Sequence, residues 1–350
     1  DDPVRPYDVT GNVDVNRGKR SILLDVKSPQ GKEVFWRLVE TADVVVENNR
    51  KGALERMGLG YQNVKARKPD IVYASLNAFG YDGPWSQRPG WEQLAQATSG
   101  IQVRRGGRDA APKLLPYPMN DYGTGLLGAY AVALALHERN RTGQGQAVDS
   151  GLTLTACLLQ SPYFLDYQGF QRQEPEGLGV RGNSALSRLY SASDGWLFLY
   201  APGGTDWLNL TSLNDFSPLA DDARFTSAKN RHDNDQALAD ELARTFEFKD
   251  RGKWELFPKA ADARMLFGLV QTPSELAHCA QLESRGFYRE VDHPVMGKLK
   301  VPSVLFNFSL TPYQMQMPSP TLGQHNNEIY ADGLGYGRED LECLKQLDVI

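Results

Sequence analysis

Three short apolar segments, separated by stretches with a helical pattern, most constrain how this chain can fold. Residues 21–25, 44–47 and 71–76 are predicted as strands, and the second contains three consecutive valines. Helices are predicted between them, one opened by Ser28 and Pro29 and another over residues 53–68. Strands that alternate with helices are typical of a parallel sheet covered by helices. The sequence therefore predicts an α/β fold.

A carboxylate precedes a long apolar helical stretch. Residues 125–136 are small and apolar on nearly every face, which indicates a helix buried inside the protein. Asp121 comes just before this stretch, beside Gly123 and Gly125, which would leave room for close approach. Two interpretations stay open, because Asp is a good helix cap and because a carboxylate held at a helix start can also act as a nucleophile.

Length and composition indicate an ordinary globular protein. The 350 residues, 41% of them hydrophobic, favour two domains over one. The net charge of −5 comes from interspersed charges, so nothing indicates binding to nucleic acid or to a membrane. Cys157, Cys279 and Cys343 match no disulfide or metal spacing, and the histidines are scattered. We therefore expect a cytoplasmic protein without a metal site.

A second, smaller domain is predicted from the middle of the chain. Residues 171–183 are polar and glycine-rich, which is typical of a linker. Asp194 and Gly195 between two apolar segments predict a hairpin, and residues 289–301 predict another. Helices are predicted over residues 235–246 and 258–263. The tail, with a helix over residues 339–347, is expected to return to the first domain.

Common catalytic motifs are absent or out of context. Two G-x-G-x-x-G matches begin at Gly123 and Gly177, but neither lies between a strand and a helix as a dinucleotide site requires. No P-loop, H-E-x-x-H, G-x-S-x-G or paired C-x-x-C occurs. A glycine- and proline-rich loop, residues 77–90, follows the third strand at its carboxyl end, where α/β sheets bind ligands. Motifs alone therefore indicate an α/β enzyme without specifying a reaction.

A series of short blocks carries a resemblance to a known family. They include Asn-Arg-Gly-Lys-Arg-Ser-Ile at residues 16–22, Gly-Tyr-Asp-Gly-Pro at 80–84 and Asp-Tyr-Gly-Thr-Gly at 121–125. Others are residues 24–27, 42–48, 54–61, 88–90, 141–146, 291–294 and 322–325. In order and spacing they make the chain resemble the class III CoA-transferases, the CaiB/BaiF family, over nearly its whole length.

The resemblance implies an architecture. A large Rossmann-like, CoA-binding domain would comprise residues 1–172 and 313–350, and its amino-terminal segment would be missing from this sequence. A small α+β domain, residues 188–306, would be inserted through linkers at 173–187 and 307–312. Two chains would interlock as a homodimer. The substrates would be an acyl-CoA thioester and a carboxylic acid, with no tightly bound cofactor.

The resemblance also implies site residues. Asp121 falls where such enzymes keep the aspartate that attacks the acyl thioester and then carries CoA. Gly203 and Gly204 are the nearest candidates for an active-site loop. Positions that contact CoA in relatives fall on Leu24, Lys27, Asn48, Arg56 and Arg88. Lys and Arg suit its phosphate groups by charge.

Departures from the family pattern keep two alternatives open. Asn49 replaces an aromatic residue near the cofactor, and the missing amino-terminal segment would suit an inactive domain of a tandem or dimeric transferase. Acyl-CoA racemases or epimerases share the fold and use a histidine after a motif like Arg-Pro-Gly. Here Trp91 and Glu92 occupy that place, which favours transfer over racemisation.

Overall fold

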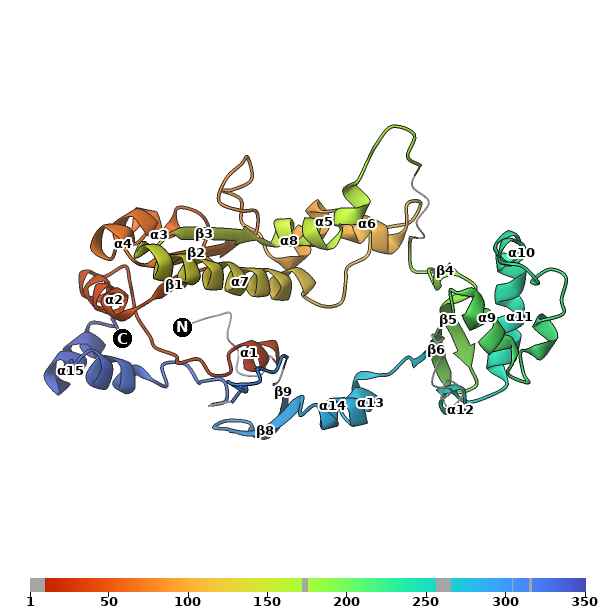
Figure 1. The fold of residues 1–350 in the computed structure, drawn as a ribbon. Helices are drawn as coiled ribbons and strands as arrows, with labels where there is room; N and C mark the ends of the chain where they lie inside the picture. Colours follow the sequence, from red (N-terminus) through yellow and green to blue (C-terminus); the bar gives the residue numbers. More distant parts are fainter. Residues whose placement is uncertain (1–9, 172–175, 256–265, 304, 315–316) are drawn as a thin grey trace. The chain divides into compact units, whose positions relative to one another are not determined.

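The protein, described by a computed structural model, comprises two compact units. The structure describes residues 10–171, 176–255, 266–303, 305–314 and 317–350. The first unit contains Asp1–Ile101, Leu114–Leu165 and Cys279–Ile350, and the second contains Gln102–Lys113 and Asp166–His278 (Figure 1). The hairpin at residues 288–302, assigned to the small domain in the sequence analysis, groups by its contacts with the first unit.

A three-stranded parallel sheet forms the centre of the first unit. Its strands are β1 (Val44–Glu47), β2 (Val72–Asn77) and β3 (Ala147–Gly151), with β2 in the middle. The valine run is therefore a strand as predicted, and the segment predicted at 71–76 forms β2. Helices cover the sheet, and the mixed α/β fold expected from the alternating pattern is confirmed. The helices of this part are α1 (Thr10–Val15), α2 (Pro29–Thr41), α3 (Ala53–Arg56), α4 (Tyr61–Arg67), α5 (Glu92–Thr98), α7 (Met119–Thr142), α8 (Leu152–Leu159) and the 3-10 turn η1 (Ser161–Phe164). Helix α6 (Ile101–Gly106) belongs, apart from Ile101, to the second unit.

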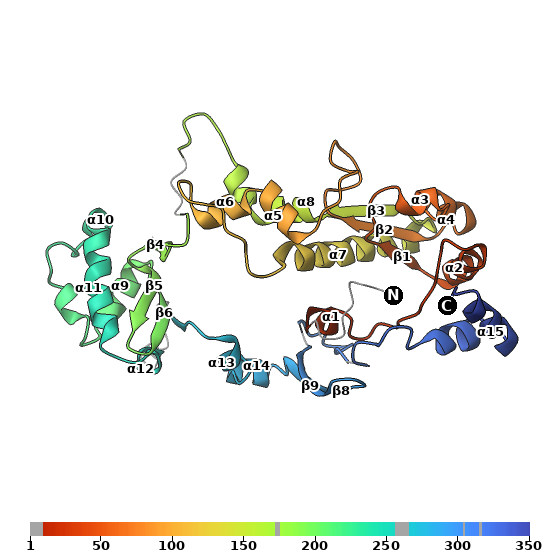
Figure 2. The same ribbon diagram turned by 180° about the vertical axis from the view of Figure 1, so that it is seen from behind.

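Helix α7 packs along the sheet, as both views show (Figures 1 and 2). Gly128 allows this close approach, because a Cβ atom there would lie 2.7 Å from the Leu76 side chain of β2. The helix ends at Gly143, whose left-handed φ of 74° suits glycine, and the Gly143 N–H donates to the Arg139 carbonyl at 2.7 Å. It begins at Met119, so Asp121 lies inside the first turn. The prediction that Asp121 caps this helix is therefore wrong.

The predicted strand at residues 21–25 is also wrong. This segment has no strand pairing, because its backbone groups bond to the tail of the chain instead. Ser21 N–H donates to His325 Nδ1 at 3.0 Å, and Leu23 N–H donates to Asn326 Oδ1 at 2.9 Å. Asp25 N–H donates to the Val349 carbonyl at 2.8 Å. A single sequence carries no periodic signal for partners about three hundred residues away.

The tail returns to the first unit, as expected. It forms the π-helical turn η4 (Glu328–Gly333) and helix α15 (Arg338–Gln346), which lies beside α2 (Figures 1 and 2). Leu341 and Leu344 of α15 and Tyr330 of η4 pack on Val34 of α2. The same unit contains α14 (Ala280–Ser284) and the predicted antiparallel hairpin, β8 (Tyr288–His293) and β9 (Gly297–Pro302). His293 is structural, since its Nδ1 accepts the N–H groups of Val295 and Met296 at the turn.

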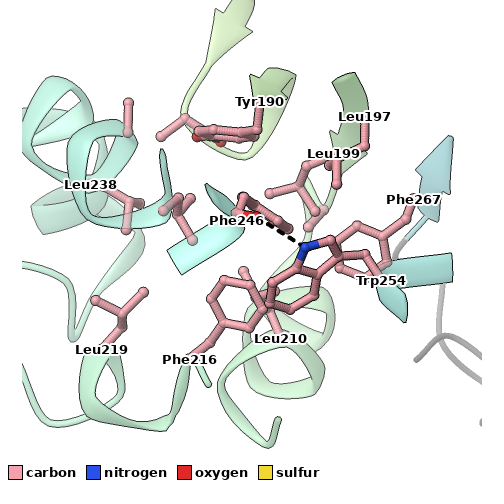
Figure 3. Packing of buried hydrophobic residues seen from close by; sticks show 14 of the residues in the cluster. Tyr190, Leu197, Leu199, Leu210, Phe216, Leu219, Leu238, Phe246, Trp254 and Phe267 are labelled. Carbon is pink, nitrogen blue, oxygen red and sulfur yellow. Dashed lines mark hydrogen bonds between the residues drawn. The ribbon is translucent and has the colours of Figure 1, made fainter. Parts of the chain in front are cut away.

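The second unit is an antiparallel sheet packed on helices. Its strands are β4 (Gly182–Ser184), β5 (Ser187–Ala192), β6 (Gly195–Tyr200) and β7 (Leu266–Leu269), so the hairpin predicted at Asp194–Gly195 is confirmed. Its core is aromatic: Trp254 donates its indole N–H to the Phe246 carbonyl at 3.1 Å, and Phe216 lies against both rings (Figure 3). Its helices are α9 (Gly204–Thr211), η2 (Ser217–Leu219), α10 (Ala228–Asp233), α11 (Asp235–Glu247), α12 (Arg251–Glu255) and α13 (Pro273–Leu276). The helix predicted over 258–263 lies outside the described residues.

Candidate functional site

A buried carboxylate holds the start of α7. Glu92, the first residue of α5, is only 3% exposed, and its Oε2 accepts the backbone N–H of Asp121 at 2.8 Å. Its Oε1 accepts the Asn120 and Gln96 side-chain amides, each at 2.8 Å. The first N–H groups of a helix have no partner within the helix, and a negative charge at that end is favourable. Glu92 therefore does from α5 what a capping side chain would do, and Pro118 at the cap position makes no side-chain bond.

The network around Glu92 reaches the segment that leads into α7. Gln96 and Asn120 are fully buried, and Gln96 Oε1 accepts the Leu115 N–H at 3.0 Å. Hydrogen bonds to a charged acceptor are stronger than neutral ones, and buried polar groups are costly when unpaired. The approach to α7 and its first turn are therefore fixed by a connected set of buried polar side chains.

Asp121, the candidate nucleophile, lies in the first turn of α7 that this network holds. Its side chain is exposed, whereas its neighbour Asn120 is buried. Burial of part of the carboxyl group, and then the nearby negative charge of Glu92, raise the pKa of Asp121 above its ordinary value of 3.8. The Asp121 N–H donates to Glu92, which holds the backbone of this residue in position, while its side chain is exposed. Such a group can attack an electrophilic carbonyl carbon.

The two glycines beside Asp121 have different roles. A Cβ atom at Gly123 would lie 2.6 Å from Thr155 Cγ2 of α8, so Gly123 allows α7 and α8 to pack closely. At the next residue of α7, the buried hydroxyl of Thr124 lies 2.6 Å from the hydroxyl of the same Thr155. At Gly125 a Cβ atom would meet no atom of the described residues within 4 Å. Only Gly125 therefore leaves open space of the kind a substrate would need.

The residues expected to bind CoA fall into two groups. Asn48 follows β1, Arg56 ends the short helix α3 after it, and Arg88 lies in the loop after β2. Carboxyl ends of parallel strands meet at one edge of a sheet, and these three residues follow the strands at that edge. Leu24 and Lys27 lie on the segment before α2, where Leu24 packs on the tail cluster and Lys27 is exposed.

Local contacts position the two arginines. The Arg56 guanidinium lies over Gly52, where a Cβ atom would be 2.9 Å from Nη1, and the φ of 83° at Gly52 suits glycine. The Arg88 guanidinium lies 5.3 Å from the Trp85 ring centroid, and Trp85 makes an edge contact with Phe79. Both side chains are exposed, so their charges face solvent, where they can meet an anion.

A cluster that sequence reasoning missed anchors the loop after β2. The Tyr81 N–H donates to Asp149 Oδ2 of β3 at 3.0 Å, and its hydroxyl donates to Glu55. Lys51 donates to the Tyr81 carbonyl and lies 3.6 Å from Asp82. Burial and the Asp82 charge raise the pKa of Asp149, and Lys51 opposes them. The sequence indicated Glu92 only as a residue in the place of the racemase histidine. Its role at the start of α7 could not be predicted, because its partners there are distant in sequence.

The glycines expected to form an active-site loop lie in the second unit. Gly203 is the cap residue of α9, and its N–H donates to Asp206 Oδ2 at 2.8 Å. Asp206 is itself buried, so the turn is anchored.

Within the described part of the chain, no group of three or more His, Cys, Asp or Glu side chains is arranged to hold a metal ion. Nor does any described helix combine the length and apolar character needed to cross a membrane.

Comparison with known proteins decides the family. The model of CoA-transferase family III matches residues 5–326, which is most of the sequence. The chain belongs to CoA-transferase family III. It is therefore an enzyme of the CoA-transferase class, for which CoA thioesters are substrates.

Relatives of this CoA-transferase family member are similar over most of its length. It is 30% identical over 342 residues to succinyl-CoA–D-citramalate CoA-transferase of Chloroflexus aurantiacus, covering 95% of this chain and 83% of that protein. It is 29% identical to succinyl-CoA:glutarate CoA-transferase of Mus musculus, covering 94% of this chain and 75% of that protein. The crystal structure of a CaiB/BaiF family protein from Brucella suis matches with a TM-score of 0.78 and 29% identity, over 93% of this chain and 86% of that one.

Proposed function

We propose that this transferase moves CoA from an acyl-CoA donor to a carboxylic acid through a covalent intermediate on Asp121. One observation carries the proposal: an exposed carboxylate with a raised pKa stands in the first turn of α7, and its backbone is held at 2.8 Å by the buried Glu92. Neither a cap side chain nor a solvated surface aspartate requires this support. A nucleophile does, since reaction depends on a fixed geometry.

The proposed steps conserve atoms and charge. The Asp121 carboxylate attacks the thioester carbonyl, the C–S bond breaks, and a mixed anhydride and CoA thiolate form. The thiolate attacks the Asp121 carbonyl, which releases the donor carboxylate and leaves an aspartyl-CoA thioester. The acceptor carboxylate then repeats the sequence in reverse and departs as its CoA thioester. The positive end of α7 lies beside the oxyanions that form at each attack, which favours them.

We propose that CoA lies along the carboxyl edge of the β1–β3 sheet. The exposed cations Lys27, Arg56 and Arg88 would contact its phosphates, while Asn48 and Leu24 would contact its less charged parts. Gly203 and Gly204 would belong to an active-site loop. Lys51 is a further cation at this edge, though its ammonium group already bonds to Tyr81.

We also propose that two chains form an interlocked homodimer in the cytoplasm, each with the smaller domain inserted into the larger one. Three large side chains spaced four residues apart on α7, Leu126, Tyr130 and Leu134, are 61%, 64% and 52% exposed. Such a stripe is typical of a helix face covered by a partner. A charge on it, as in Tyr130→Asp, should dissociate the dimer in sedimentation velocity. An unchanged sedimentation coefficient would remove this support.

The alternatives gain less support. In a racemase, a base must reach the α-carbon of the substrate, but Glu92 is buried and already accepts three hydrogen bonds, and Trp91 has no basic atom. The inactive-domain alternative would leave the exposed Asp121 carboxylate, whose pKa is raised, without a chemical role. Transfer is therefore the function that the geometry favours.

A donor and acceptor screen tests the proposal. The wild-type protein and Asp121→Ala would be incubated with acyl-CoA donors and carboxylate acceptors, and the new acyl-CoA would be measured by mass spectrometry. We expect transfer by the wild type and none by Asp121→Ala. Equal transfer by both proteins would reject Asp121 as the nucleophile.

A further inference from the structure

An apolar cavity shares a wall with the first turn of α7. It has a volume of about 420 Å³, within the range of small-molecule sites. Its apolar lining comes from the hairpin, through Met296, Leu299, Val301 and Pro302, and from Val13 of α1. Tyr122 of α7 completes the lining together with Asp14 and Lys300. The cavity thus joins segments from both ends of the chain to the turn that contains Asp121.

The position of Tyr122 connects the cavity to the reacting carboxylate. Tyr122 directly follows Asp121, so their Cα atoms are about 3.8 Å apart. The Tyr122 hydroxyl donates to Asp14 Oδ2 at 2.9 Å, and Arg17 Nη1 donates to Asp14 Oδ1 at 2.5 Å. These contacts tie α1 to α7 and fix the wall. Successive side chains on a helix point about 100° apart, so an acyl tail would run from the Asp121 carboxylate around the first turn of α7 to enter the cavity.

We propose that this cavity holds the acyl group and selects monocarboxylic acyl groups with an apolar tail over dicarboxylic ones. The inference rests on the proposed function. A second carboxylate would meet mostly apolar walls, and its burial there is unfavourable. The one lining cation, Lys300, is engaged elsewhere: its ammonium lies 4.0 Å from Glu283 and 4.7 Å from the Tyr288 ring centroid. An apolar tail is favoured by the same apolar walls.

Donor series measure this preference directly. Acetyl-, propionyl-, butyryl- and hexanoyl-CoA would be compared with succinyl-CoA, using the full chain and one fixed acceptor. Burial of each methylene should raise kcat/KM about fourfold until the cavity is filled. Succinyl-CoA, with the chain length of butyryl-CoA and a second carboxylate, should be used roughly tenfold less well or worse. A higher kcat/KM for succinyl-CoA than for butyryl-CoA would overturn the inference.

Two neighbouring turn residues provide a matched pair of variants. Met296→Trp places an indole at the cavity and should raise KM for hexanoyl-CoA much more than for acetyl-CoA. Val295→Trp adds the same group to an exposed residue of the same turn and should change neither value. Equal effects of both variants on the two donors would contradict the assignment. Met296 is itself 37% exposed, so the substitution should be tolerated by the fold.

The inference and the proposed function can fail separately. If no donor transfers CoA, the proposed function fails, and calorimetry with hexanoate as the probe then decides the role of the cavity. Hexanoate binding that Met296→Trp weakens and Val295→Trp preserves would support an apolar acyl site. Absence of hexanoate binding to the wild type would overturn it.

Discussion

Replacing the buried carboxylate by its amide, Glu92→Gln, should affect both the stability of the first unit and the pH dependence of Asp121. Glu92 accepts three N–H groups, two on Oε1 and one on Oε2. A glutamine has one acceptor oxygen, so at least one of these donors would face an NH2 group. An orphaned buried donor costs about 1–3 kcal/mol, and the bonds that remain lose their charge assistance. We therefore expect a loss of about 2–4 kcal/mol in the free energy of unfolding of this unit.

Glu92→Gln should also shift the acid limb of the pH–rate profile. In the proposed mechanism Asp121 reacts as the carboxylate, so the rate should fall as the pH drops through its pKa. The charge of Glu92 helps to raise the pKa of Asp121, so its removal should shift the acid limb to lower pH. Part of the elevation should remain, because burial is the larger cause. The assay is the pH dependence of single-turnover CoA release from an acyl-CoA donor.

Another glutamate, Glu138 of α7, provides the control. Glu138 pairs with Arg141 on the exposed surface, so Glu138→Gln should leave both the acid limb and the unfolding transition unchanged. The reasoning would be refuted if Glu92→Gln matched the wild type in denaturant stability and in the position of the acid limb. An acid limb that moved to higher pH would refute the electrostatic part alone.

Three further predictions concern the same region. Asp121→Asn should be inactive yet more stable than the wild type at neutral pH. The pKa of Asp121 is raised in the folded state, so its ionisation disfavours folding. Denaturant titrations should therefore show that the gain in free energy of unfolding vanishes below about pH 3.8, where both states are protonated. Gly123→Ala should destabilise the first unit by about 1–3 kcal/mol through the clash with α8. Gly125→Ala, in open space, should instead stabilise α7 by up to about 1 kcal/mol. Thermal unfolding measures both effects, and the opposite order of stabilities would contradict the roles assigned to the two glycines. Arg56→Gln should weaken CoA binding about tenfold in calorimetry and reduce the salt dependence of binding. Arg338→Gln, on the exposed face of α15, should change neither quantity. Equal affinities of the two variants for CoA would exclude Arg56 from the CoA site.

Local pattern predicted the regular elements well. The strand at 44–47 and both hairpins follow from short apolar runs and turn residues, because their signals lie within a few residues of each other. The segment at 21–25 has the same apolar character, yet its partners are His325, Asn326 and Val349. Only the folded chain brings those groups together, so local periodicity could not distinguish this segment from a strand.

The candidate site was predicted only in part. Asp121 is a candidate because of its place before an apolar helix and because of the family blocks, but the prediction that it caps the helix was wrong, because Glu92 takes that role from another helix. Nothing in the spacing of Glu92 and Asp121 marks them as neighbours. The cavity beside Tyr122 depends equally on distant segments. Pairings of this kind come from tertiary packing, which one sequence does not encode in a readable pattern.

The most direct test of the central claim is to trap the intermediate. The protein would be incubated with an acyl-CoA donor, treated with hydroxylamine, digested and analysed by mass spectrometry. The account predicts a hydroxamate on Asp121 in the peptide from the start of α7, formed only when donor is present and lost in Asp121→Asn. Efficient CoA transfer with an unmodified Asp121 peptide would contradict it.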